Sequence, residues 1–419
     1  MQKYDLVVIG GGPAGMAAAI GAKEQGIENI LILEREDQLG GVLKQCIHSG
    51  FGMFTFKEEL TGPEYAQRFI DKIEQYKIKY KLSTAVLDLS SEKVITAVNE
   101  QDGILEIQAK AIILAMGCCE RPRGAINIPG TRRAGVYTAG TAQKFVNLDG
   151  YMPGKQVVIL GSGDVGLIMA RRMTLEGAKV KAVIEMMPYP RGLKKNISQC
   201  LEDFNIPLKL SHAIIEIKGS DRVEGITIAK IDENKVPIKG TEEYIPCDTL
   251  LISVGLIPEN YLAEKANIKL SPKTQGPEIN ESMQTDVEGI FACGDVIYVH
   301  NWVDSVTIES YNAGKHAANY LYGKSVDSNT SELIAGEGIA YTVPRYVNPI
   351  NIEDFLDIVY RPKEVYRDSK LLIYFDNEEV LCEDKKVLYP GETENIKINK
   401  EIFNKYPNCK SITIKIQKF

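Results

Sequence analysis

The feature that most constrains the fold of this chain is a pattern of strand, glycine-rich turn, helix, strand and acidic residue that occurs twice. In the first copy, the apolar run 4–9 leads into Gly10-Gly-Gly-Pro-Ala-Gly15, and an alanine-rich helical segment follows at 16–25. The next predicted strand, 29–33, ends in Glu34, 24 positions after Gly10. A GxGxxG turn between a buried parallel strand and a helix, with an acid at this distance, is typical of dinucleotide-binding domains.

Each part of this turn has a physical task. Gly10 permits the tight turn, Gly12 lets a pyrophosphate approach the backbone, and Gly15 lets the helix pack closely on the strand. The N–H groups at the start of the helix attract phosphates, and Glu34 can accept hydrogen bonds from a ribose. A single glycine-rich turn is weak evidence, because such turns also have structural uses.

The second copy begins with an apolar strand at 156–160. It continues through Gly161-Ser-Gly-Asp-Val-Gly166, a helix at 167–175 and a strand at 180–184 that ends in Glu185, again 24 positions after its first glycine. A purely structural explanation would have to hold for both copies. The repeat therefore predicts two nucleotide sites in an α/β fold with two Rossmann-like domains.

Length and composition limit the other possibilities. The 419 residues suffice for two or three domains, and 44% apolar with 25% charged residues is ordinary for a soluble globular protein. A net charge of -7 without a basic run argues against nucleic-acid binding. The eight cysteines form no CxxC pair, so we expect no zinc or iron–sulfur site. No signal peptide or membrane anchor is recognisable, and the cytoplasm is the expected compartment.

Two further segments are expected to complete the first site. Residues 111–117 form a predicted strand that ends in Gly117, and residues 289–295 form another that ends in Gly294-Asp295. The aspartate can bind a polyol chain or orient water at a pyrophosphate. A helix is predicted from about 305 to 322, and the partial positive charge at its start can stabilise an electron-rich ring carbonyl.

With these segments in this order, the chain resembles the two-dinucleotide-binding-domain flavoproteins, the superfamily of glutathione reductase and thioredoxin reductase. The resemblance covers about residues 1–325 and implies that FAD binds at the first turn and the Gly-Asp segment, and NAD(H) at the second turn. It implies FAD contacts at Gly10, Gly12, Gly15, Glu34, Gly117, Gly294 and Asp295, and NAD(H) contacts at Gly161, Gly163, Gly166 and Glu185. Neighbouring positions complete the expected cofactor contacts: Pro13, Ala14, Arg35, Gly41, Val42, Leu43, Val86, Ala115, Asp164, Val165 and Gly255.

The positions that carry redox dithiols in this superfamily hold no cysteine here. Disulfide reductases place two cysteines shortly after the first acid, where this chain has Leu43 and His48. The thioredoxin reductase variant places CxxC in the nicotinamide domain, where this chain has Ala139 and Ala142. The resemblance therefore implies an FAD-dependent NAD(P)H oxidoreductase without a redox-active disulfide.

Cys46 and His48 are the candidate catalytic residues, and each has a structural alternative. Cys46 is either a redox cysteine that cycles through sulfenic acid or a packing residue. His48 either donates a proton or hydrogen bond to reduced flavin or holds the loop at 51–56. Trp302 either covers the flavin or lies in a plain surface loop.

A narrower resemblance concerns partners. Gln45-Cys-Ile-His-Ser-Gly-Phe-Gly52 and Glu59-Leu-Thr-Gly-Pro-Glu-Tyr65 are similar to a branch of oxidoreductases that accompany an anaerobic glycerol-3-phosphate dehydrogenase-like flavoprotein and a small cysteine-containing protein. The chain is also similar to the flavin- and NADH-handling subunits of amino-acid and opine dehydrogenase complexes. This resemblance implies an electron-transfer subunit in a homo- or hetero-oligomer, whose companion flavoprotein oxidises the organic substrate. Two alternatives stay open: a stand-alone NADH oxidase or peroxidase that uses Cys46, and a non-catalytic flavin-containing assembly subunit.

Charge favours NADH over NADPH. A 2′-phosphate beside Glu185 would be repelled, and Met186-Met-Pro, which follows, supplies no cation. Arg191 is the nearest cation downstream, in a loop that could fold back.

The order of the motifs divides the chain. We expect a discontinuous FAD-binding domain at 1–122 and 265–328, with the NAD(H)-binding domain inserted at 123–264. Residues 329–419 are expected to form a small β-rich domain that serves in docking.

Two sets of strands are predicted in these parts. Within the insert, strands at 214–217, 223–229 and 249–254 are expected to close one sheet. In the C-terminal part, short strands are predicted at 356–360, 371–375 and 411–416.

Overall fold

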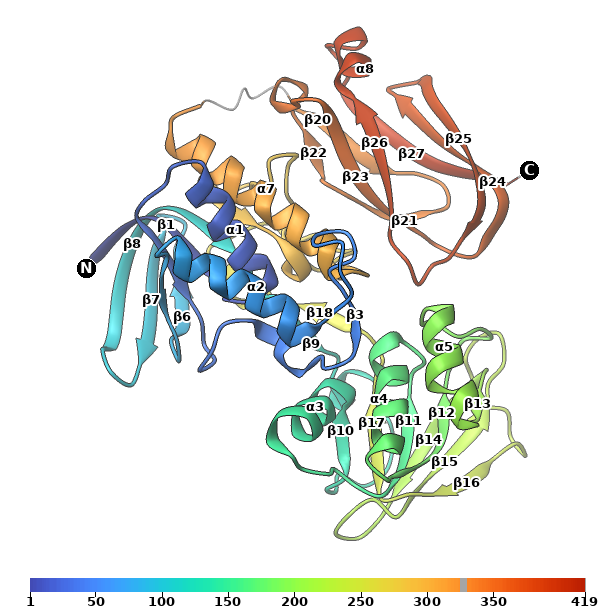
Figure 1. Ribbon diagram of the computed structural model, residues 1–419. Coiled ribbons are helices and arrows are strands. Elements are labelled where there is room, and N and C mark those ends of the chain that lie inside the picture. Colours follow the sequence, from blue (N-terminus) through green and yellow to red (C-terminus); the bar gives the residue numbers. More distant parts are fainter. Residues whose placement is uncertain (325–329, 419) are drawn as a thin grey trace. The chain divides into compact units, whose positions relative to one another are not determined.

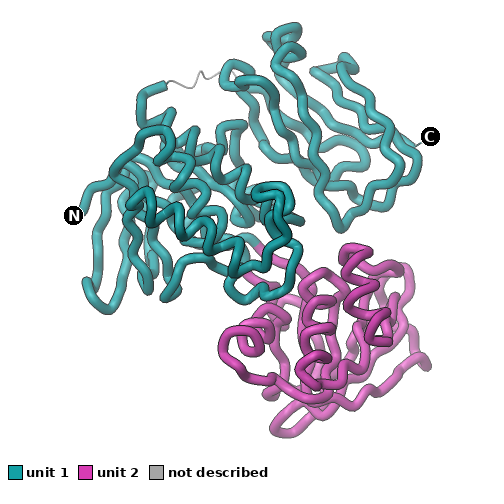
Figure 2. Tube along the Cα trace, in the orientation of Figure 1, with its two compact units in different colours: residues 1–118, 258–419 teal, residues 119–257 magenta. Residues whose placement is uncertain are grey.

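A computed structural model describes residues 1–324 and 330–418 of the chain. The chain divides into two compact units (Figure 2). The first unit contains residues 1–118 and the chain from 258 onwards, and the second contains residues 119–257. The expected boundary at 264 lies within helix α6 (Tyr261–Lys265), whose Leu262 and Ala263 are buried in the core of the first unit.

The first unit is built on a seven-stranded sheet with a parallel centre (Figure 1). The strands run in the order β5-β2-β1-β8-β7-β6, and β19 pairs with β8. Their bounds are β1 Gln2–Ile9, β2 Ile30–Leu33, β5 Lys79–Lys81, β6 Ala85–Leu89, β7 Val94–Asn99, β8 Gly103–Leu114 and β19 Ile290–Ala292. Ile9 lies opposite both Leu33 and Leu114, and Leu114 lies opposite Ala292. Because these parallel strands end at one edge, the segments that follow them meet there.

Three helices cover one face of this sheet: α1 (Pro13–Glu24), α2 (Gly62–Gln75) and α7 (Val303–Leu321). Figure 1 shows α1 and α7 side by side. They approach so closely that a Cβ at position 314 would collide with the backbone of α1 at Ala18, and glycine at this position makes that approach possible. Helix α2 begins at a capping box of Thr61 and Glu64.

The second unit contains a parallel five-stranded sheet in the order β10-β17-β11-β12-β13. Its strands are β10 Val136–Thr138, β11 Gln156–Leu160, β12 Lys179–Ile184, β13 Leu208–Lys209 and β17 Thr249–Ile252, and its helices are α3 Ala139–Lys144, α4 Asp164–Leu175 and α5 Lys194–Cys200.

The prediction that the strands near 214, 223 and 249 close one sheet is wrong. The first two fall in β14 (His212–Lys218) and β15 (Gly225–Lys230), which form a separate antiparallel sheet with β16 (Glu243–Pro246). Strand β17 is buried along its whole length and lies inside the parallel sheet. The difference follows from burial, because a continuous apolar run suits a parallel strand covered on both faces.

The C-terminal part forms two sheets, which confirms the expected β-rich region. One has the order β22-β20-β27-β24-β25 and the other β21-β23-β26. Their strands are β20 Ser331–Ala335, β21 Ile339–Val343, β22 Tyr346–Val347, β23 Phe355–Pro362, β24 Tyr366–Phe375, β25 Glu378–Leu388, β26 Glu394–Asn399 and β27 Ser411–Lys418, with helix α8 at Lys400–Lys405. The three strands predicted here coincide with β23, β24 and β27, which share one hydrophobic core.

The remaining short strands are β3 Ser49–Phe51, β4 Leu60–Thr61, β9 Cys118–Glu120 and β18 Leu256–Pro258. Within the described residues, no helix has the length and apolar character needed to cross a membrane.

Candidate functional site

The first glycine-rich loop lies at the carboxyl edge of the seven-stranded sheet. Gly10 has a φ of 107°, and a Cβ there would collide with the carbonyl oxygen of Ala115. A Cβ at Gly15 would collide with the carbonyl oxygen of Gly10. The packing of the protein itself therefore requires both glycines.

Gly12 is different, because the protein around it leaves room for a side chain. Its φ is -74°, and the nearest atom to a Cβ there would be Cα of Gly41, at 3.9 Å. Gly12 is the N-cap of α1 and offers no side-chain cap, and Pro13 takes the first helical position. The first N–H groups of a helix have no partner within it. The open space and the uncapped helix start form a cradle that suits a pyrophosphate.

Glu34 is buried and turned back toward this loop. Its Oε2 accepts a hydrogen bond from the backbone N–H of Gly11 at 2.6 Å, and its Oε1 accepts one from that of Glu36 at 2.8 Å. The carboxylate at the strand end therefore also fixes the loop, a role that the sequence did not indicate. The neighbouring Arg35 is exposed.

The second loop repeats this geometry. Gly161 has a φ of 100°, and a Cβ there would collide with the backbone of Ser253. Gly163 has a φ of -70°, and none of the described atoms would lie within 4 Å of a Cβ there. Glu185 accepts a hydrogen bond from the N–H of Ser162 at 3.0 Å, as Glu34 does from Gly11. The second loop thus presents an equivalent cradle at the start of α4.

The segment after Glu185 folds back onto this second loop. The backbone N–H of Arg191 donates to Oγ of Ser162 at 3.0 Å, and Asp164 accepts from the N–H of Leu193 at 2.8 Å. The side chain of Arg191 is exposed. Asp164 is therefore committed to holding this segment, whereas Arg191 lies beside the cradle.

Other expected contacts are distributed around the first loop. Gly41 adjoins Gly12, and Ala115 adjoins Gly10. Gly117 follows with a φ of 73°. Val86 packs against the hydrophobic core on the sheet face opposite α1. The remaining expected residues are Ala14, Leu43 and Gly294, which are buried, Gly166, which is buried in α4, Val42 and Gly255, which are exposed, and Val165, which is half-buried.

Cys46 and His48 follow a helical turn at 41–45. The Cys46 thiol donates to the carbonyl oxygen of Val42 at 3.4 Å, and burial raises the pKa of Cys46 to about 12. At neutral pH this group is a thiol, which is a poor nucleophile. The His48 ring lies against the Phe51 ring, with their centroids 5.1 Å apart. Both residues thus make the kind of contacts that their structural alternatives require.

The loop at 51–56 is anchored from α7 by a residue that the sequence did not single out. Asp304 is buried, and it accepts hydrogen bonds from the N–H groups of Gly52 at 3.3 Å and Thr55 at 2.8 Å. This carboxylate stands in the first turn of α7, at the helix start that the sequence predicts to face a flavin carbonyl. The negative charge of Asp304 therefore interacts with the partial positive charge at the start of α7.

The Gly294-Asp295 segment follows β19 and is bound by a histidine. Oδ1 of Asp295 accepts hydrogen bonds from the backbone N–H of His300 at 3.0 Å and from its Nδ1 at 2.9 Å. His300 stands two positions before Trp302 and belongs to neither glycine-rich turn. The sequence feature that points to this contact is the position of His300 five residues after Asp295.

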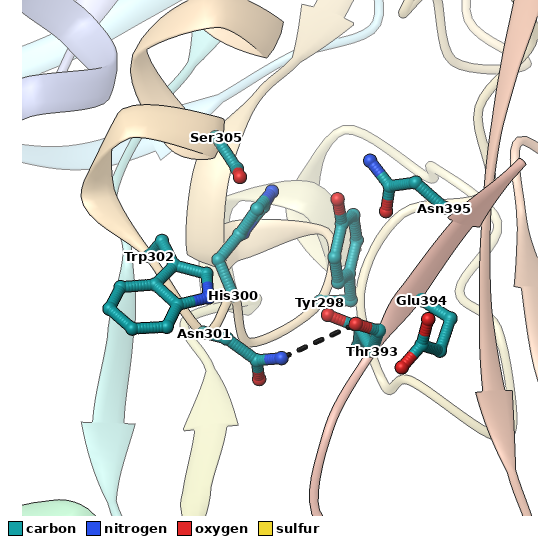
Figure 3. A pocket seen from close by; sticks show the side chains of 8 residues that line it. All are labelled: Tyr298, His300, Asn301, Trp302, Ser305, Thr393, Glu394 and Asn395. Carbon is teal, nitrogen blue, oxygen red and sulfur yellow. Dashed lines mark hydrogen bonds between the residues drawn. The ribbon is translucent and has the colours of Figure 1, made fainter. Parts of the chain in front are cut away.

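A cavity of about 190 Å³ lies next to this segment (Figure 3). Its lining residues are Tyr298, His300, Asn301, Trp302, Ser305, Thr393, Glu394 and Asn395. Trp302 is the N-cap residue of α7 and is 45% exposed. Its indole is thus a wall of a polar cavity.

Comparison with known proteins places the chain in a family. Residues 4–318 match the family model of the pyridine nucleotide-disulphide oxidoreductases, and the chain therefore belongs to that family. It is 28% identical over 322 residues to an alkyl hydroperoxide reductase subunit of Staphylococcus epidermidis, which is 75% of this chain and 58% of that protein. It is 25% identical over 286 residues to the hydrogen cyanide synthase subunit HcnB of Pseudomonas protegens, which is 63% of this chain and 59% of that protein. The chain thus spans less than two thirds of the length of these relatives.

The fold of this chain is also similar to that of a solved structure. The fold matches the thioredoxin reductase of T. acidophilum with a TM-score of 0.62 and 25% identity, over 78% of this chain and 100% of that chain. The two Rossmann-like sheets expected from the repeat are thereby confirmed. The family implies FAD and NAD(P)H, and the two cradles fit two dinucleotides, because each has an uncapped helix start and an open glycine.

Proposed function

We propose that this chain exchanges a hydride between NADH and FAD and does so without a redox-active disulfide. The observation that carries the proposal is that both cradles, at Gly12 and Gly163, are complete within one chain. When bound, FAD accepts a hydride at its ring and passes electrons onward. The residues of this chain contribute binding, orientation and electrostatics.

The residues at the superfamily's dithiol positions support this proposal. Leu43 is 2% exposed and packs in the core of the first unit. Ala139 and Ala142 are fully buried in the core of the second. The fourth position, His48, packs against an aromatic ring. Each of these side chains has a packing role and none is a thiol.

The number of electrons that the FAD-loaded protein takes up tests whether it lacks a redox-active dithiol. The FAD-loaded protein is titrated anaerobically with dithionite while the flavin absorbance is followed. The proposal predicts that two electrons per FAD complete the reduction, because a redox-active dithiol would take up two more. An uptake of four electrons per FAD would overturn it.

We propose NADH as the preferred nucleotide. The Glu185 carboxylate is fixed beside the second loop by Ser162, and a 2′-phosphate there would be repelled. The segment that folds back brings Arg191 next to this loop, so Arg191 is the cation that could bind the 2′-phosphate of NADPH. Steady-state rates should favour NADH, and Arg191→Ala should lower the residual rate with NADPH and leave the rate with NADH unchanged. Faster reduction by NADPH in the native protein would contradict this preference.

We also propose that the chain works as the electron-transfer subunit of a cytoplasmic multi-subunit dehydrogenase. Both relatives named above are themselves subunits of larger enzymes by name. The companions would be a glycerol-3-phosphate dehydrogenase-like flavoprotein that oxidises the organic substrate and a small cysteine-containing electron carrier. Affinity purification from the native host, followed by mass spectrometry, should recover a second flavoprotein. Recovery of this chain alone, under conditions that keep FAD bound, would contradict the subunit role.

Peroxide reduction is the second candidate, because the first relative named above belongs to a hydroperoxide reductase. Cys46 would be its nucleophile. The high pKa of the Cys46 thiol, about 12 because of burial, makes it a weak one. NADH-dependent peroxide turnover that disappears in Cys46→Ser would support this candidate, and equal or absent turnover in both proteins would reject it.

A further inference from the structure

A buried histidine links two carboxylates beside the Gly294-Asp295 segment. The side chain of His300 is 3% exposed, with Nδ1 2.9 Å from Oδ1 of Asp295 and Nε2 3.1 Å from Oε2 of Glu309. A carboxylate accepts and does not donate, so each ring nitrogen must carry a proton. His300 is therefore an imidazolium held between two anions.

Glu309 completes a closed ring of hydrogen bonds. Its Oε1 accepts from the backbone N–H of Gly294 at 2.8 Å, and its Oε2 also accepts from the hydroxyl of Tyr298 at 3.0 Å. The Tyr298 ring lies against the imidazole, with centroids 4.0 Å apart, and Figure 3 shows the two side chains. Gly294 and Asp295 are thus held by neighbouring members of one cluster. In the described part of the chain, the contact of Asp295 Oδ2 is the Cys118 thiol at 3.6 Å.

Protonation of His300 halves the net negative charge of this cluster. Burial alone would lower the pKa of His300, but Glu309 and Asp295 raise it to about 10. At neutral pH, one cation thus stands between two carboxylates, and the cluster carries a single net negative charge. Without the cation it would carry two.

We propose that His300 is a positioning residue for FAD: it holds Oδ1 of Asp295 so that Oδ2, which the Cys118 thiol contacts at 3.6 Å, can also accept from the cofactor, and it offsets negative charge beside the Gly-Asp segment. The proposal rests on the proposed function, in which the Gly-Asp segment contacts FAD. Neither His300 nor Glu309 belongs to a glycine-rich turn or to the Gly-Asp segment.

Equilibrium FAD binding to the full chain tests the proposal without relying on turnover. Apo-protein is titrated with FAD at neutral pH and flavin fluorescence is followed, for the native protein, His300→Gln, Glu309→Gln and the double variant. His316→Gln is the matched control, since His316 lies on α7, as Glu309 does, and burial lowers its pKa to about 4, so its replacement removes no charge at neutral pH. Thermal unfolding of each apo-protein is measured alongside.

We expect His300→Gln to raise the FAD dissociation constant about tenfold or more, because it leaves two partly buried carboxylates uncompensated. The double variant should recover most of this loss, since it removes one of those carboxylates, and such a rescue would not follow from a purely structural role. Glu309→Gln alone should stay within about threefold of the native protein, because the His300–Asp295 pair persists. The control should match the native protein.

Other results would overturn the inference. If His300→Gln bound FAD like the native protein, or if the double variant bound more weakly than His300→Gln, His300 would not act through charge. Should His300→Gln fail to fold, a loss of about tenfold or more in Glu309→Gln would refute the charge argument by itself. A native protein that does not bind FAD would overturn the proposed function, whereas native binding without a difference between variants would overturn only the role of His300.

Discussion

Replacing the middle glycine of each loop by alanine should separate the two nucleotide sites experimentally. Gly12 and Gly163 have φ values of -74° and -70°, which alanine adopts without strain. A Cβ would lie 3.9 Å from its nearest neighbour at Gly12 and would have none of the described atoms within 4 Å at Gly163. Neither methyl group therefore disturbs the protein itself.

The expected size of the effect follows from this geometry. Alanine is a poorer N-cap than glycine by up to roughly 1 kcal/mol, and the loss of unfolded-state entropy returns about 0.4–1 kcal/mol. The apo-protein should thus change in free energy of unfolding by less than about 1 kcal/mol. A methyl group in the space where a pyrophosphate approaches should cost about 1–3 kcal/mol of binding, which is roughly 5- to 150-fold in the dissociation constant.

The assay measures both nucleotides in both variants. FAD affinity comes from titration of the apo-protein, and NADH affinity comes from the dependence of the flavin reduction rate on NADH concentration. Gly12→Ala should weaken FAD alone and Gly163→Ala should weaken NADH alone. Gly15→Ala is the contrast, because its Cβ would collide with the Gly10 carbonyl oxygen and should destabilise the apo-protein. A Gly12→Ala protein that binds FAD like the native protein, or loses stability like Gly15→Ala, would refute this reasoning.

Three further predictions concern single side chains. The pKa of His300 is raised from 6.5 to about 10 on folding, so protonated His300 stabilises the fold fully below about pH 6.5, and this stabilisation is lost as the pH rises toward 10. In chemical denaturation, the free energy of unfolding of the native protein should fall by a few kcal/mol relative to that of His300→Gln across this pH window. Parallel pH profiles of the two proteins would contradict this prediction. Tyr65→Phe should lower the free energy of unfolding by about 1–2 kcal/mol, because the fully buried hydroxyl lies 2.7 Å from Oγ1 of Thr307, and an unchanged denaturation midpoint would show that this hydrogen bond contributes nothing. Cys46→Ser should keep the rate of flavin reduction by NADH, measured by stopped flow, since burial raises the pKa of Cys46 to about 12 and keeps it a thiol; a large loss of rate would give Cys46 a redox role.

The two nucleotide cradles could be predicted from sequence because their requirements are local. Gly10 and Gly161 need a positive φ and a close backbone approach, and only glycine meets both needs. The buried strands before each turn are short apolar runs with an abrupt end, so the edge of each sheet is fixed to within a residue or two.

The rest depends on contacts that no local pattern specifies. Glu34 and Glu185 bind the loops that precede them, which becomes visible only once the strand ends lie together. His300 and Glu309 are nine positions apart and meet because the loop after β19 turns back onto α7. The separate sheet of β14, β15 and β16 is not predicted for a related reason. Alternation of apolar and polar residues along a strand does not specify which strand pairs with it.

Hydride transfer between NADH and FAD within this one chain is the central functional proposal. Anaerobic stopped-flow mixing of the FAD-loaded protein with NADH tests it most directly, with the absorbance of oxidised flavin as the signal. We expect rapid bleaching of that absorbance, with a rate that saturates as the NADH concentration rises. A flavin that stays oxidised in the presence of excess NADH would contradict the claim and leave an assembly role as the better explanation.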